Sequence, residues 1–180
     1  MMPVSFLQCC IIIILLSFSL PRPALAGMEE FKIKAAMIYN FTKYVEWPAS
    51  GLPTGNPLNV CITGSSTLRQ HLDQLQGKQV NGRTISVRFI MLPIEISGCN
   101  LLFIDRSEQH RLPSFVQQAN RKPILTVSDI DQFTIHGGMI GFVEQDDKIR
   151  FEINQENASQ AGINISSKLL KLARVVKGSK

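Results

Sequence analysis

CNLLFID, residues 99–105, and PILTVSD, residues 123–129, are short runs that are apolar almost throughout and that both close on an aspartate. Continuous apolar runs of this kind are typical of strands that are buried on both faces of a parallel sheet. Residues 107–120, which lie between them, are expected to be helical from about Leu112, where Pro113 is tolerated in the first turn. Buried strands that alternate with helices predict an α/β fold.

The rest of the chain extends this alternation. Further strands are expected at residues 57–64 and 83–92, and further helices at residues 29–46, 66–76 and 158–176. Two more strands flank the polar turn at residues 145–148 and are expected to form a β-hairpin. We therefore predict a single layered α/β domain with a mixed, mostly buried sheet flanked by helices, and with a β-hairpin near the C-terminus.

The first 26 residues have the composition of an export signal. An apolar run at residues 11–20 is broken only by two serines, and the sequence ALA follows it at residues 24–26. A short apolar run before an A-x-A site is typical of a secretory signal peptide, and the run is short for a membrane span. We expect cleavage between Ala26 and Gly27, which leaves residues 27–180 as the mature domain. An uncleaved N-terminal anchor is the alternative.

Two cysteines remain after this cleavage, Cys61 and Cys99. In an oxidising compartment such a pair is typical of one disulfide bond. The loop that the bond would close is long enough for about 4 kcal/mol of stabilisation on the chain-entropy model. Two buried free thiols, or a metal-binding or catalytic thiol, are the alternatives, although no CxxC or His-x-x-His motif accompanies the pair.

Charge is distributed unevenly along the chain. The full sequence has a formal net charge of +5, and no acidic residue follows Glu156. Five of the basic residues fall within the last thirteen positions, namely Lys168, Lys171, Arg174, Lys177 and Lys180. No basic stripe interleaves with stacking aromatics, so we expect no nucleic-acid partner. The bases are interpreted as a solvated helix face, with anionic headgroups or an acidic partner as the alternative.

The sequence shows no catalytic or metal-binding constellation. His71, His110 and His136 are scattered without the spacing of metal ligands, and nucleophile-elbow, Walker and dinucleotide-binding motifs are missing. Asp105 and Asp129 end successive strands, where open α/β sheets place ligands. Because no nucleophile or base accompanies them, we interpret both as solvated loop acids. We expect no enzymatic activity, no cofactor and no metal.

Aromatic residues concentrate in KIKAAMIYNFTKYVEWP, residues 32–48, which holds both tyrosines and the only tryptophan. Its apolar residues recur at helical spacing, and Trp47-Pro48 is typical of a helix end. Charged residues interrupt the stretch, which argues against a membrane belt. We interpret it as an amphipathic helix packed on the core, with Tyr39 and Tyr44 as candidate partner-binding residues.

Several segments, taken together and in order, resemble the YfiR-like family of bacterial periplasmic proteins. They are KAAMIYNFTKYVEWP, LNVCITGSSTL, VNGRTISV, CNLLFID, PILTVSD, GGMIGFVEQDDKIRFEIN and SSKLLKLARVV. Each alone is a weak signal, but their order and spacing cover essentially the whole mature chain. The match includes Cys61 and Cys99, which align with the family's cysteine pair at strand ends. A second pair that some members carry in the region of residues 133–142 is missing here.

The resemblance implies an exported, compact α/β protein that dimerises and acts as a repressor. Such proteins bind the periplasmic sensor region of an inner-membrane GGDEF diguanylate cyclase and hold it inactive. Release, through an outer-membrane lipoprotein or a redox or envelope-stress cue, raises cyclic di-GMP and promotes biofilm. We therefore expect a periplasmic homodimer with these partners. The alternative is a small-molecule-binding module that serves another membrane sensor, for which a pocket near Asp105 and Asp129 would be the sign.

Overall fold

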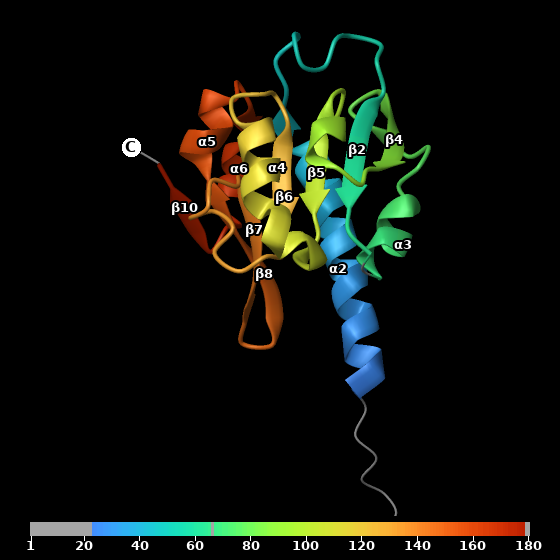
Figure 1. Cartoon of the computed structure of the whole chain (residues 1–180), viewed down its shortest axis with the longest axis vertical. Coiled ribbons are helices and arrows are strands. Elements are labelled where there is room, and N and C mark those ends of the chain that lie inside the picture. Colours follow the sequence, from blue (N-terminus) through green and yellow to red (C-terminus); the bar gives the residue numbers. More distant parts are fainter. Residues whose placement is uncertain (1–22, 66, 179–180) are drawn as a thin grey trace, which may run out of the picture.

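A mixed sheet lies at the centre of the molecule, within residues 23–65 and 67–178, which this computed structural model describes. Its strands are β2 (Leu58–Thr63), β3 (Gln79–Val80), β4 (Arg83–Phe89), β5 (Leu101–Ile104), β6 (Leu125–Ser128), β7 (Ile140–Gln145), β8 (Lys148–Asn154) and β10 (Val175–Lys177). In space they follow the order β10-β8-β7-β6-β5-β2-β4-β3 (Figure 1). The strands from β4 across to β7 are parallel, whereas β3 and β8 run antiparallel to their neighbours β4 and β7. The predicted mixed sheet is confirmed.

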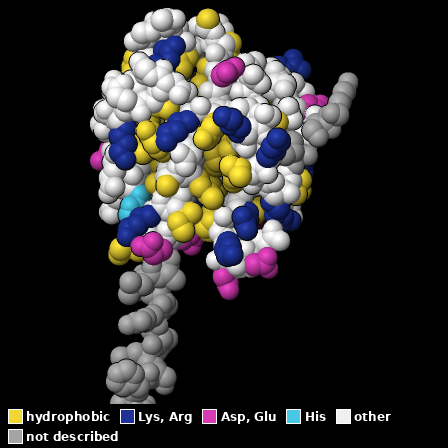
Figure 2. All heavy atoms as spheres, turned by 180° about the vertical axis from the view of Figure 1, so that it is seen from behind, with side chains coloured by type: hydrophobic (Ala, Val, Ile, Leu, Met, Phe, Trp, Pro, Cys, Tyr) yellow, Lys and Arg dark blue, Asp and Glu magenta, His cyan; other side chains and the backbone are white. Residues whose placement is uncertain are grey.

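Helices cover both faces of this sheet. They are α2 (Pro23–Lys43), α3 (Leu68–Asp73), α4 (Leu112–Ala119), α5 (Gln155–Gln160) and α6 (Ser167–Leu170), with 3-10 turns at η1 (Pro93–Ile96) and η2 (Arg106–Arg111). In Figure 1, α4 lies in front of the sheet and α2 lies behind it. Figure 2 views the α2 side, where hydrophobic side chains gather near the middle with Lys and Arg side chains around them.

The sheet separates two apolar cores. Leu101 and Phe103 of β5 belong to the core beside α2, whereas Leu102 and Ile104 belong to the core beside α4. All four side chains are fully buried. Burial of a side chain of this size contributes about 1.5–3 kcal/mol to the free energy of unfolding. Alternation between two cores therefore explains why this segment is apolar at every position, as a strand buried on both faces must be.

The first predicted helix ends earlier than expected. The apolar spacing predicted a helix to residue 46, but α2 ends at Lys43. Val45 and Glu46 form the short strand β1, which pairs antiparallel with β9 (Asn164–Ile165). A pairing between residues this distant in sequence leaves no local signal, so the helical spacing ran past the true end.

The predicted helix at residues 158–176 is wrong. The structure has α5, the short strand β9, α6 and β10 in its place. Gly162 has a φ of 72°, which ends helical conformation after α5. Ser166 caps the start of α6 by accepting a hydrogen bond from the backbone N–H of Leu169. The basic residues of this region consequently do not share one continuous helix face.

Two other predictions from the sequence hold. Helix α4 begins at Leu112, with Pro113 in its first turn, as the proline required. Strands β7 and β8 pair as an antiparallel hairpin that closes at Gln145 and Lys148. The two turn residues between them, Asp146 and Asp147, both have positive φ angles, of 51° and 54°. This is the conformation of a two-residue type I′ turn, whose twist matches that of a hairpin.

The predicted signal peptide lies mostly outside the described residues. Residues 1–22 are not described, and residues 23–26 belong to the first turn of α2. Cleavage between Ala26 and Gly27 stays a prediction. Within residues 23–65 and 67–178, no helix is both long enough and apolar enough to cross a bilayer.

Candidate functional site

A cleft of about 680 Å³ opens at the carboxyl ends of β5 and β6. Residues 30–34 of α2 and the hairpin β7–β8 form its sides. Arg174, which directly precedes β10, also lines the cleft. Ligands of open α/β sheets bind outside the carboxyl ends of the strands, which is the edge where this cleft lies. The position therefore qualifies the cleft as the candidate site.

Lys34 is a buried cation in the wall of this cleft. It is 5% exposed, and its Nζ lies 2.6 Å from Oε1 of Glu30 and 3.0 Å from Oδ2 of Asp129. Glu30 reaches Lys34 because residues four apart lie on the same side of a helix. A buried charge is tolerated only when it is paired, so these two carboxylates are what permit Lys34 to be inside.

Asp105 and Asp129 are buried, which corrects their interpretation as solvated loop acids. They are 2% and 7% exposed. Asp129 accepts a hydrogen bond from the backbone N–H of Arg106 on its Oδ1, in addition to its ion pair with Lys34. Asp129 meets Lys34 of α2, whereas Asp105 lies against Gly64 after the end of β2.

One oxygen of Asp105 is left without a partner. Its Oδ1 accepts a hydrogen bond from the backbone N–H of Ser107 and so caps the start of η2. Its Oδ2 is buried and has no hydrogen-bond partner among the described residues. Gly64, at the end of β2, has a φ of +90°, and a Cβ there would lie 2.4 Å from the Cβ of Asp105. Glycine at position 64 therefore permits the close approach of β2 to this aspartate.

The remaining lining combines an apolar wall with exposed charges at the mouth. Phe31, Phe142, Val143 and Ile149 provide apolar surface. At the mouth, Arg106 pairs with Asp131 at 3.0 Å, and both side chains are exposed. Most of the lining residues are polar or charged, so the cleft is more polar than the mainly apolar pockets that are typical of small-molecule sites. This arrangement supplies binding groups, and no nucleophile paired with a base lies among the lining residues.

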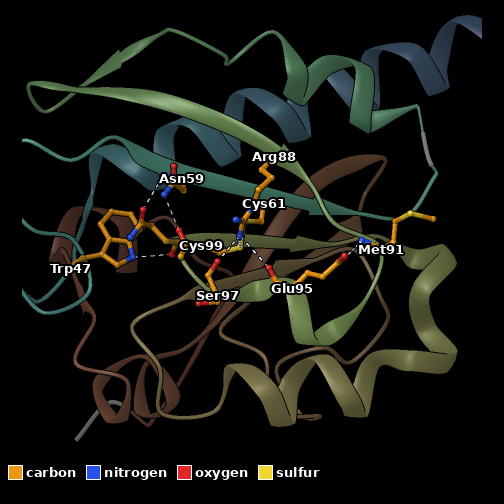
Figure 3. The surroundings of a disulfide bond; sticks show 10 residues. Trp47, Asn59, Cys61, Arg88, Met91, Glu95, Ser97 and Cys99 are labelled. Carbon is orange, nitrogen blue, oxygen red and sulfur yellow. Dashed lines mark hydrogen bonds between the residues drawn. A yellow bond between two sulfur atoms is a disulfide. The ribbon is translucent and has the colours of Figure 1, made fainter.

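The predicted disulfide bond between Cys61 and Cys99 is present on the other side of the sheet (Figure 3). It joins Cys61 of β2 to Cys99, which lies two residues before β5, and the two Cα atoms are 5.7 Å apart. Arg88 covers it, since a terminal nitrogen of its guanidinium lies 3.2 Å from Sγ of Cys99. The same nitrogen donates to the carbonyl oxygen of Ser97 at 2.6 Å and to that of Glu95 at 3.1 Å.

Glu95 shapes the segment beside this disulfide bond. Its carboxylate accepts hydrogen bonds from the backbone N–H groups of Met91 at 2.7 Å and of Leu92 at 2.8 Å. The hydrogen bonds from Leu92 and then Met91, together with the weaker effect of the positive charge of Arg88, hold the pKa of Glu95 below its ordinary value, although burial opposes them. The charged form of Glu95 therefore fixes this segment.

Of the two candidate tyrosines, Tyr39 belongs to α2 and Tyr44 follows the end of this helix. Tyr39 is half-buried, and its hydroxyl donates a hydrogen bond to the carbonyl oxygen of Gln79 in β3. Tyr44 is 37% exposed, and its carbonyl oxygen accepts a hydrogen bond from the backbone N–H of Ser166. The structure therefore does not bring them into one site. A partner-binding role for either residue stays a prediction.

Lys34 is the site residue that sequence reasoning missed. Its signal was available, because position 34 falls on the same face of the helix as Phe31, Ile38 and Phe41, which pack on the sheet. A lysine on an otherwise apolar face implies a buried counter-ion. For metals, no group of three His, Cys, Asp or Glu side chains within the described ranges is placed to hold an ion.

One solved structure shows a distant likeness to this chain. A crystal structure of an ABC domain in complex with L-Trp from Streptococcus pneumonia is 16% identical, with a TM-score of 0.47. The alignment covers 68% of this chain and 56% of that chain, so this protein spans little more than half the length of that relative. Similarity at this level supports no inference about a shared ligand. No curated protein matches the chain.

Comparison with protein families gives a clear result. Residues 31–174 match the family described as DUF4154, YfiR/HmsC-like. The matched range begins at Phe31 in the cleft wall, includes both cysteines of the disulfide bond, and ends at Arg174. It covers both layers of helices and all strands of the central sheet except β10. The chain belongs to the YfiR/HmsC-like family.

Proposed function

We propose that this protein is a periplasmic repressor of an inner-membrane GGDEF diguanylate cyclase. It binds the periplasmic sensor region of the cyclase, holds the enzyme inactive, and so lowers cyclic di-GMP and biofilm formation. Family membership over residues 31–174 is the observation that carries the proposal, because the YfiR/HmsC-like family implies periplasmic regulation of diguanylate cyclase. Homodimerisation, and release by an outer-membrane lipoprotein, belong to the same proposal.

The chemistry of the described residues supports a regulatory role. In the cleft, Lys34 forms ion pairs with Glu30 and Asp129, and Arg106 forms an ion pair with Asp131. Catalytic acids and bases need pKa values matched to proton transfer and a substrate within reach. Groups that neutralise one another in ion pairs are instead suited to stabilising the fold and to binding a partner, which is what a regulatory protein requires.

A direct binding measurement tests the proposal. The mature protein, purified from the periplasm, is titrated against the isolated periplasmic region of a candidate GGDEF membrane protein from the same genome. We expect saturable binding with a Kd in the micromolar range or tighter, which corresponds to about 8 kcal/mol of binding free energy or more. The periplasmic region of an unrelated membrane sensor serves as the control. Equal affinity for the two periplasmic regions, or no binding to either of them, would contradict the proposal.

The cleft favours a second candidate, a module that binds a small molecule and serves a membrane sensor. It lies where the alternative required a pocket, and both Asp105 and Asp129 line it. Native mass spectrometry of the protein from periplasmic extract tests this candidate, which predicts a co-purifying small molecule. Ile149→Arg, which fills the cleft, should remove the extra mass. Ile94→Arg, at an exposed apolar position elsewhere, should leave it. An unliganded wild-type protein counts against this candidate.

A further inference from the structure

One surface of the molecule combines exposed apolar side chains with unpaired basic charge. It is formed by the outer side of α2 and by the segment from α6 to β10, and we call it the α2–α6 face. The backbone N–H of Ser166 donates to the carbonyl oxygen of Tyr44 at 2.9 Å, and β1 pairs with β9, so the two elements are neighbours. Figure 2 shows this side of the molecule, with hydrophobic side chains at its middle and basic side chains around them.

The apolar part of the face contains residues from both elements. On α2, Ile33 and Met37 are four residues apart, which places them along one stripe of the helix, and Tyr44 follows the last residue of α2, Lys43. Ile33 is 44% exposed and Tyr44 is 37% exposed, while Met37 is half-buried. On the C-terminal segment, Leu172 is 65% exposed. Leu170 and Ala173 pack half-buried beside the core.

The basic part of the face comes from the C-terminal segment. Residues 157–178 contain four basic side chains and no acid, namely Lys168, Lys171, Arg174 and Lys177. Among the described residues, only Arg174 in this set forms an ion pair, with Glu152 at 3.7 Å. Glu30, the nearby acid on α2, already pairs with Lys34. Lys168 and Lys171 are exposed and without an ion pair in the described part of the chain, so their charge is available to a partner.

We infer that the α2–α6 face docks an acidic amphipathic segment of the cyclase's sensor region. The apolar side chains of that segment pack against Ile33, Met37 and Leu172, and its carboxylates meet Lys168 and Lys171. Opposite charges at the edge of such an interface accelerate association and fix orientation, while apolar contacts at its centre supply affinity. This inference rests on the proposed function and adds to it the surface and the chemistry of the partner.

A protein segment fits this face better than a membrane does. Met37, Leu170 and Ala173 are half-buried, whereas Leu172 is 65% exposed, so the apolar part of the face is uneven. Packed side chains of another protein match the shape of such a surface. Insertion into lipid instead requires a helix whose apolar side protrudes and whose polar side is strongly basic. Here the exposed end of α2 also carries the acids Glu29 and Glu30.

Charge reversal tests the inference in the same titration against the periplasmic region of the cyclase. The double variant Lys168→Glu/Lys171→Glu should weaken binding by roughly tenfold or more, because two attractive contacts become repulsive. Leu172→Ser should also weaken binding, by roughly fivefold, because an exposed apolar contact is lost. The wild-type affinity should fall as salt is added, and the affinity of the double variant should fall less.

Arg121→Glu/Lys122→Glu is the matched control. It changes the net charge equally at exposed positions that follow α4, on the other side of the sheet, and should bind as the wild type does. If the wild type binds the cyclase region and the Lys168→Glu/Lys171→Glu variant binds it equally well, the inference is overturned. The proposed function is then unaffected. If the wild type does not bind at all, the proposed function itself fails.

Vesicles separate the protein partner from a membrane. The wild type and the double variant are sedimented with phosphatidylglycerol vesicles and with neutral phosphatidylcholine vesicles. The inference expects no difference between the two proteins on either kind of vesicle. Binding to the anionic vesicles that only the wild type shows, with equal affinity of both proteins for the cyclase region, would assign the face to lipid and overturn the inference.

Discussion

Lys34 links the first helix to the two strand ends that form the cleft. Its side chain is 7% exposed, and its ammonium group forms ion pairs with one carboxylate of α2 and with another that follows the end of β6. Removing water from such a group is costly, and only its partners offset that cost. The position of α2 over the cleft therefore depends on a charged contact as well as on apolar packing.

Replacement of this lysine should destabilise the fold. Lys34→Met leaves the buried carboxylate of Asp129 without its cation, and we expect the free energy of unfolding to fall by about 3 kcal/mol. The double variant Lys34→Met/Asp129→Asn should recover part of the loss, since the unpaired charge is removed. Urea denaturation of the wild type, the single variants Lys34→Met and Asp129→Asn, and the double variant gives the four free energies of unfolding. A single variant as stable as the wild type would contradict the buried ion pair.

Glu95 should make the segment beside the disulfide bond sensitive to acid. The pKa of Glu95 is lower in the folded protein than in the unfolded chain, because Leu92, Met91 and Arg88 favour the charged carboxylate. Its contribution to stability is therefore present above the unfolded pKa and is lost as the pH falls through the folded pKa. The amide resonances of Met91 and Leu92 should shift with a midpoint below the ordinary value for glutamate.

The variant Glu95→Gln is the control for that titration. Glutamine keeps an acceptor for the two amides but does not ionise in this range. The two amide resonances should then lose the acid transition. A wild-type midpoint at or above the ordinary value of glutamate, or a transition that persists in Glu95→Gln, would refute the role given to this carboxylate.

Among the secondary-structure elements, the buried strands were the most predictable. Strand β5 is apolar at every position because its side chains alternate between two cores, and β6 is buried throughout with Leu125 and Val127 in the core beside α2. The apolar runs that mark both strands are visible without the structure. The turn of the β7–β8 hairpin was equally visible, in its polar residues. Pattern and local chemistry decide such elements, so sequence reasoning reached them.

The C-terminal segment was not predictable in the same way. Ile165, Leu169, Leu172 and Val176 recur at helical spacing, yet Ile165 belongs to a strand that pairs with Val45. Likewise, β10 pairs parallel with β8. These contacts join residues distant in sequence and outweigh a weak helical preference that Gly162 already interrupts. The site shared this limit, because the ion pair of Lys34 with Asp129 also joins distant elements.

The disulfide bond should contribute strongly to the stability of the sheet. It closes a loop of 38 residues that contains α3, β3, β4 and η1. Its removal in Cys61→Ala/Cys99→Ala should lower the free energy of unfolding by about 4 kcal/mol. Guanidinium denaturation measures this difference, with the wild type under reducing conditions as a second reference. Thiol labelling of the unfolded, unreduced mature protein should find no free cysteine, and two labelled thiols would refute the bond.

At the scale of the whole molecule, the sheet divides the protein into two working sides. The side of α4 holds the disulfide bond and the segment fixed by Glu95. The other side holds α2, the cleft and the α2–α6 face. A regulator needs a rigid body that presents a surface to its partner, and the two cores on either side of the sheet provide that body. The order of the strands, which creates the cleft, arises from crossovers that the sequence does not encode locally.

The level of cyclic di-GMP in cells tests the central claim most directly. The gene for this protein is deleted in a strain that contains the candidate cyclase, and cyclic di-GMP is measured with and without a plasmid that restores the protein. A repressor predicts that cyclic di-GMP rises on deletion, returns on restoration, and does not rise when the cyclase gene is deleted as well. An unchanged level of cyclic di-GMP after deletion, in cells that make the cyclase, would contradict the account.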